Sequence, residues 1–198
     1  MNIIERVQRI LLQPKTEWYV IQQEPTLPAQ LYTGYIMPLA AIGPICTVIG
    51  LLLFGASYFG PLMISIPIVP IIVGAVIQYA LALAGVYVMA LIIDALAPTF
   101  MGQKQIYQAL KLYAYSATPG WLGGIFAIIP QLSIIGALLG LYGLYLLYLG
   151  IPVMMQCPPD KAIGYTATVV IVAIVVFVII GVIVGAITAA MFRASLGL

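Results

Sequence analysis

Side chains able to do chemistry are scarce in this sequence, and their spacing favours no catalytic site. The 198 residues include five carboxylates, seven Lys or Arg and no histidine. A serine nucleophile therefore has no histidine base. Two cysteines without histidine, Cys46 and Cys157, make no zinc site. The sequence also has no glycine-rich phosphate loop. It predicts a protein that is not an enzyme, with no catalytic residues, metal or cofactor.

Polar residues inside apolar stretches are the remaining candidates for a site. Gln78, Thr118, Tyr142 and Tyr145 carry amide or hydroxyl groups within such stretches. These groups can hydrogen-bond a neighbouring helix, a lipid headgroup or a small neutral solute. We expect these four residues to line a polar cavity. For Gln78 an alternative role is favoured, which is hydrogen bonding to a neighbouring helix.

Composition places these residues in a membrane. The chain is 64% hydrophobic and 6% charged, with a mean hydropathy of +1.19, whereas soluble domains carry about 25% charged residues. Apolar runs longer than about 18 residues are typical of transmembrane helices. The net charge of +2 gives no basic field for nucleic acid. The expected fold is an all-α polytopic membrane helix bundle, with membrane lipids as partners.

Five apolar segments are long enough to cross a membrane, so five transmembrane helices are expected, over residues 32–54, 68–97, 112–129, 132–154 and 163–192. They form a transmembrane domain over residues 31–198, preceded by a cytoplasmic arm over residues 1–30. The arm begins with an amphipathic pattern over residues 1–13. This pattern predicts a helix lying in the membrane interface, or alternatively a helix packed on the protein's own loops.

Glycines recur at four-residue spacing in the last two expected helices. The pairs are Gly136 with Gly140 and Gly181 with Gly185, and each allows another backbone to come close. One face is enough to pack these two helices together. The other face is then free to meet a second copy or another membrane protein, unless both are used inside the chain. If the fifth-helix face is the outer one, Gly140→Leu should damage the fold, whereas Gly185→Leu should affect only oligomers.

Basic residues define the orientation. In a five-helix chain, only Arg193 lies on one side of the membrane. The other six basic residues share the opposite side: Arg6, Arg9, Lys15, Lys104, Lys111 and Lys161. The positive-inside rule places the N-terminus in the cytoplasm and the C-terminus in the periplasm or outside the cell. Asp94, Lys104 and Lys111 should then lie at the cytoplasmic surface, where either lysine can pair with Asp94.

Three short motifs give the chain a family resemblance. They are Leu-Gln-Pro-Lys-x-x-Trp ending at Trp18, Tyr115-x-x-x-Pro119, and Tyr148-Leu-Gly-Ile-Pro152. With the layout above, they resemble the Yip1 family, and most closely its small bacterial inner-membrane members. The resemblance implies residence in a bacterial inner membrane.

Two functions are compatible with these features. The first is a non-enzymatic membrane-organising or adaptor protein that acts through helix association. The alternative is a transporter or lipid-handling protein with a cavity near the break at Pro119, since a proline followed by glycines kinks a helix. An internal cavity lined by polar groups favours the second function, and a dry core favours the first.

Overall fold

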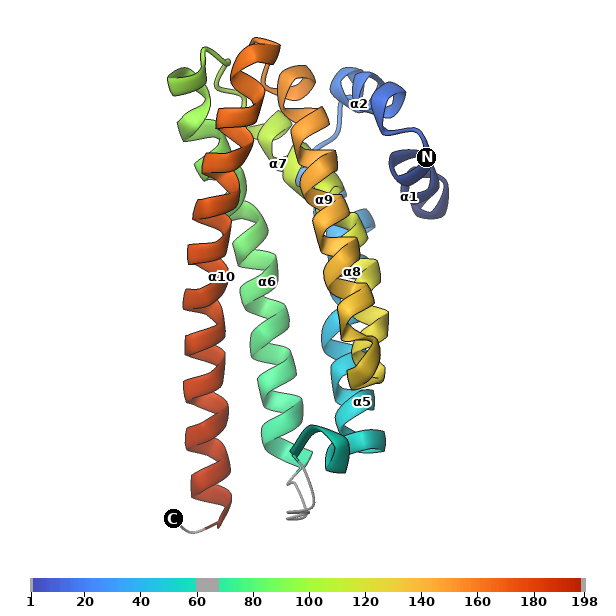
Figure 1. Cartoon of the computed structure of the whole chain (residues 1–198), viewed down its shortest axis with the longest axis vertical. Coiled ribbons are helices and arrows are strands. Elements are labelled where there is room, and N and C mark those ends of the chain that lie inside the picture. The colour runs from blue at the N-terminus through green and yellow to red at the C-terminus, as the bar shows by residue number, and fades with distance from the viewer. Residues whose placement is uncertain (1, 60–67, 197–198) are drawn as a thin grey trace.

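The fold is a bundle of long helices with a small helical arm at one end (Figure 1). The computed structural model describes residues 2–59 and 68–196, and within these ranges the chain is helical apart from short connections. The all-α prediction is confirmed.

Within the described ranges, four helical segments are long and apolar enough to cross a membrane: Pro28–Phe54, Ile68–Phe100, Ser133–Met154 and Pro159–Met191. The first combines α3 (Pro28–Leu31), η1 (Tyr32–Ile36) and α4 (Met37–Ala40) with most of α5 (Ile42–Phe59). The others contain α6 (Ile68–Leu96) with η2 (Ala97–Phe100), then α9 (Ser133–Met154), then α10 (Pro159–Leu196). They support the prediction of a polytopic bundle.

The helix expected over residues 112–129 is not continuous. The chain forms α7 (Ile106–Ser116), α8 (Thr118–Gly123), η3 (Gly124–Ile128) and η4 (Pro130–Leu132) in its place. Pro119 has no N–H for the preceding turn, and the glycines that follow it favour helix weakly. The pieces still run back along α9, against which α7, α8 and η3 all pack. Among the described residues, four helical segments therefore reach spanning length, and the segment expected as a fifth is in pieces.

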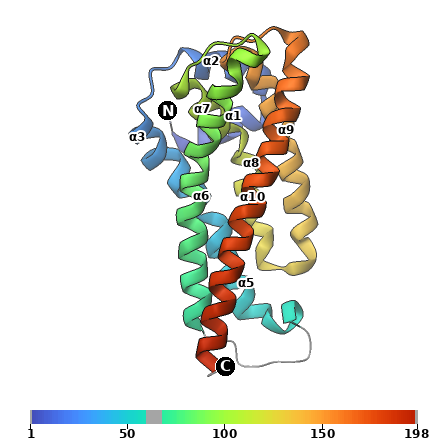
Figure 2. The ribbon, with the colours of Figure 1, turned by 90° about the vertical axis from the view of Figure 1, so that its left-hand side faces the viewer.

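The arm consists of α1 (Ile3–Leu12) and α2 (Pro14–Gln23), at the end of the bundle where α6 meets α7 and α9 meets α10 (Figures 1 and 2). Ile10, Trp18 and Ile21 are fully buried, so the arm packs on the protein itself, though on its helices, α9 in particular, and not on its loops as the alternative had it. Ile4 and Leu12 remain exposed. Their insertion into a membrane interface stays a prediction.

The glycine face of α9 packs against α7 and α8. A Cβ added at Gly136 would lie 2.8 Å from the Gly123 carbonyl oxygen, and one at Gly143 would lie 2.6 Å from that of Ser116. Gly140 differs, because a Cβ there would meet nothing within 4 Å. No close backbone contact at Gly140 therefore supports the prediction that Gly140→Leu damages the fold, and it stays a prediction.

The glycine face of α10 has no partner in the described part of the chain. An added Cβ would meet nothing within 4 Å at either Gly181 or Gly185, and both residues are exposed. The alternative in which both glycine faces are used internally does not hold for these residues.

Candidate functional site

A buried polar centre fixes the arm to the bundle; we define it as Arg6, Glu17, Glu24, Lys111 and Tyr115. Arg6 on α1 forms ion pairs with Glu17 on α2 and with Glu24 at the end of α2. Its guanidinium carbon lies 5.5 Å from the ring centroid of Tyr115 on α7. Arg6 and Glu17 are each 4% exposed. A buried charge without a partner is costly, so these pairs hold α1 against α2, and the contact of Arg6 with Tyr115 joins the arm to α7.

Lys111 belongs to this centre and not to the surface. Its Nζ donates to the backbone carbonyls of Ile21 and Glu24 at 2.7 and 3.0 Å, and the residue is 4% exposed. The prediction of a surface position is wrong, because the last carbonyls of α2 attract a cation and α7 turns Lys111 toward them. Burial lowers the pKa of Lys111, although the charge of Glu24 opposes the shift.

Arg6 is held in its charged, protonated form. Burial disfavours the guanidinium, but the hydrogen bond to Glu24 and the nearby acidic groups outweigh burial and raise the pKa of Arg6. The centre pairs two cations with two carboxylates and two carbonyl oxygens. Its charges are satisfied within the protein, so it has the character of a structural clamp.

The three family-like motifs meet around this clamp. Trp18 is fully buried and lies against Gly150 in the third motif. A Cβ at Gly150 would come within 2.5 Å of Leu112 Cδ1 and 2.7 Å of the Trp18 ring. Tyr115, from the second motif, lies beneath Arg6. Sequence reasoning missed this meeting, although opposite charges spaced along the arm offered a signal for internal pairing.

The remaining residues expected at the cytoplasmic surface do not pair. Lys104 is exposed, as predicted. Asp94 is half-buried near the end of α6, and one of its carboxylate oxygens is buried without a hydrogen-bond partner. Among the described residues Asp94 makes no ion pair. The expected pair with Lys111 fails because Lys111 reaches α2 instead.

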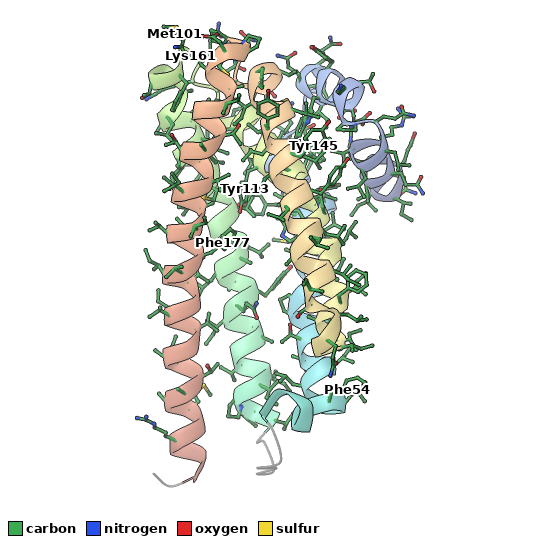
Figure 3. All side chains as sticks on the ribbon, viewed as in Figure 1. Phe54, Met101, Tyr113, Tyr145, Lys161 and Phe177 are labelled. Atoms are coloured by element: carbon green, nitrogen blue, oxygen red, sulfur yellow. The ribbon has the colours of Figure 1, made fainter. Side chains whose placement is uncertain are left out.

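A second feature is a cavity of about 360 Å³ inside the bundle, beside the Pro119 break. Residues from α6, α7, α8, α9 and α10 line it, among them Gln78, Ser116, Trp121, Gly140 and Ala173. Tyr113 also lines it, and Figure 3 shows this residue between α10 and α9. The described residues that line this cavity include no charged side chain.

Of the four residues expected to share a polar cavity, only Gln78 lines this one. Thr118 is fully buried, with its hydroxyl 2.7 Å from that of Tyr35. Tyr142 donates to the Leu11 carbonyl at 2.7 Å, and Tyr145 is exposed with its ring 5.7 Å from that of Tyr142. The prediction of one shared site is wrong. The glycine face of α9 meets α7 and α8, so the tyrosines on its other side face the arm and the exterior.

Polar groups in the cavity lack partners. The Ser116 hydroxyl is buried without a hydrogen bond, and the residue is 5% exposed. The Tyr113 hydroxyl and the Gln78 amide also make no hydrogen bond to the described residues, but Tyr113 is only partly buried and Gln78 is exposed. Unlike the clamp, the cavity therefore presents unused hydrogen-bonding groups in apolar surroundings, as ligand sites do.

Comparison with known proteins agrees with the motifs. The family model described as the Yip1 domain matches residues 9–180. Inner membrane protein YohC of Escherichia coli (strain K12) is 27% identical over 164 residues, which cover 81% of this chain and 84% of that protein. The protein of the same name from Escherichia coli O6:H1 matches equally well. No solved structure matches the chain significantly. With the family model covering most of its length, the chain belongs to the Yip1 domain family.

Proposed function

We propose that this protein is a non-enzymatic, lipid-handling membrane protein that takes one hydrocarbon chain of a bilayer lipid into the cavity beside Pro119. The observation that carries the proposal is the cavity itself. Its volume of about 360 Å³ lies within the range of ligand sites, roughly 300–1,000 Å³. Its lining is largely apolar, and the described lining residues carry no charge, which suits a hydrocarbon chain and not an ion.

The shape of the cavity supports a single chain as the occupant. Its lining extends from Gln78 to Met89 on α6 and from Val169 to Ile180 on α10, which is ~16 Å along each helix. A volume of 360 Å³ spread over that length gives a mean cross-section of about 22 Å². This is close to the cross-sectional area of one extended hydrocarbon chain. Residues of both α9 and α10 line the cavity, among them Leu144 and Val176, so the occupant lies between these two helices.

Localisation in a bacterial inner membrane is part of the proposal. The relatives named above are inner membrane proteins, and the described part of this chain has four apolar helical segments of spanning length. We take the broken segment over residues 112–129 as the fifth passage, because its pieces run back along α9. With five passages, the positive-inside rule puts the arm in the cytoplasm and the C-terminus on the opposite side.

Lipid retention by cavity variants tests the proposed function. The protein is purified from membranes in mild detergent, and bound phospholipid per chain is counted by native mass spectrometry. Gly140→Leu should abolish the bound lipid while leaving the fold intact, because its side chain enters free space in the cavity. The control is Gly181→Leu, the same change at an exposed position of α10, which should retain the lipid. Equal retention by both variants would reject the proposal.

A second candidate, the membrane-organising or adaptor function, rests on the outer face of α10. Gly181 and Gly185 are exposed there and unpacked in the described chain, a surface on which another transmembrane helix can come close. This function needs a partner, which is either a second copy of the chain or another membrane protein. Cross-linking of wild-type protein and of Gly185→Leu in native membranes tests this candidate.

A further inference from the structure

The unpartnered hydroxyl groups of the cavity identify the chemistry of its ligand. Ser116 and Tyr113 lie three residues apart on α7 and therefore share one face of that helix, and both line the cavity. Serine in a helix commonly bonds the carbonyl four residues earlier. Thr118 approaches this geometry, with its hydroxyl 3.4 Å from the Ala114 carbonyl oxygen, but the Ser116 hydroxyl is buried with no partner. Burying a hydroxyl without a hydrogen bond is unfavourable.

We infer that the cavity selects an acyl chain, one that ends in a carbonyl group, and that the Ser116 and Tyr113 hydroxyls donate hydrogen bonds to that carbonyl. This inference rests on the proposed function and names the ligand class of the same site. Both hydroxyls are donors, and an ester carbonyl is a stronger acceptor than the ether oxygen of an alkyl lipid. The lining contains no cation to hold a phosphate, so a headgroup stays outside the cavity.

The position of the hydroxyls fits the carbonyl level of a bilayer. The helix α7 lies at the arm end of the bundle (Figure 1), and Tyr113 lies seven residues, ~10 Å, after the first residue of α7. Along α6, the cavity lining runs from Gln78 at one end to Met89 at the other. A chain whose carbonyl lies at Ser116 therefore extends along α6 toward Gln78, away from the arm and into the hydrocarbon core.

Two sources supply this chemistry, an ester of a glycerophospholipid and a free fatty acid. Competition by defined lipids separates them. The full chain in nanodiscs is loaded with a photoreactive diacyl phosphatidylcholine, and labelling is competed with unlabelled diester phosphatidylcholine, its dialkyl ether analogue of equal chain length, or palmitate. The diester should compete at least about fivefold better than the ether, the size expected for one net hydrogen bond. Competition by palmitate at the strength of the diester would identify the free acid as a ligand.

Variants at the two hydroxyls test the contacts directly. Ser116→Ala combined with Tyr113→Phe should remove the preference for ester over ether while leaving binding of the ether lipid unchanged. Matched controls are Ser133→Ala and Tyr148→Phe, at exposed positions outside the cavity lining, which should keep the preference.

The outcomes separate the inference from the function on which it rests. If ester and ether lipids compete equally in the wild-type protein, and Gly140→Leu blocks labelling, the carbonyl inference fails while lipid binding stands. A preference that survives the double substitution also overturns the inference. If neither lipid competes, the proposed function itself fails.

Discussion

Removing the Arg6 charge should loosen the arm, because Arg6 on α1 pairs with Glu17 on α2 and lies over Tyr115 of α7. Arg6→Met leaves Glu17 buried without a cation, since Glu17 is 4% exposed and this ion pair is its charge partner. Breaking a buried pair in this way costs about 3–5 kcal/mol. We take the lower value, about 3 kcal/mol, because the Glu24 side chain is 36% exposed and can return to water. The opening equilibrium of the arm should then rise about 100-fold.

Hydrogen–deuterium exchange of α1 and α2 measures this opening, because exchange of protected amides follows the local opening equilibrium. The matched control is Arg9→Met, one turn further along the same helix. Arg9 pairs with Glu5 at 2.6 Å, but both side chains are about half exposed, so its loss should change exchange about twofold or less. If Arg6→Met accelerated exchange no more than Arg9→Met does, the clamp would not hold the arm.

Gly150→Ala should also loosen the arm, by about 1–3 kcal/mol, because its Cβ would overlap the Trp18 ring; exchange of α2 and Trp18 fluorescence report the change, and an unaltered Tm and spectrum would contradict it. Burial holds the pKa of Lys111 below its ordinary 10.5 in the folded protein, so the unfolded chain binds more protons and stability should rise as pH increases toward that value. Lys111→Met should remove that rise in thermal unfolding experiments, and a rise of equal size in the variant would assign it to another group. Gly185→Leu should leave the monomer folded and reduce cross-linked oligomers, whereas a wild-type protein that is strictly monomeric in native-like lipid would refute self-association through this face. A reporter active only outside the cytoplasm should be active after Leu198 and silent near residue 103, and the reverse pattern would overturn the five-passage topology.

The sequence predicted the position of a helix correctly where a long apolar segment defines that helix. The expected segment 68–97 corresponds to α6 at Ile68–Leu96, and 132–154 corresponds to α9 at Ser133–Met154. A membrane requires each crossing to satisfy its own backbone hydrogen bonds over a fixed thickness, so composition alone defines such segments. The interruption near Pro119 also followed from the sequence, because a proline followed by glycines breaks a helix, but the division of the segment into α7, α8 and η3 was not predicted.

The candidate site was less predictable because it depends on how each helix is rotated about its axis. Tyr142 bonds Leu11, a residue 131 positions away, and Lys111 bonds carbonyls of α2 about 90 positions away. A periodic pattern shows which residues share a face but not which neighbour that face meets. Once Gly143 packs on Ser116, the tyrosines of α9 must face elsewhere, and the cavity takes its polar groups from α6 and α7.

Mapping the residues labelled by a photoreactive acyl chain tests the central claim most directly. The protein is reconstituted in proteoliposomes. Ala173 lines the cavity, whereas the adjacent Ile174 is exposed on the outer surface of α10 and serves as an internal control for labelling by bulk lipid. Labelling should occur at both residues in the wild-type protein. In Gly140→Leu it should disappear at Ala173 and persist at Ile174. An unlabelled Ala173 in the wild-type protein, or equal labelling of Ala173 in the variant, would contradict the account of a lipid chain inside the bundle.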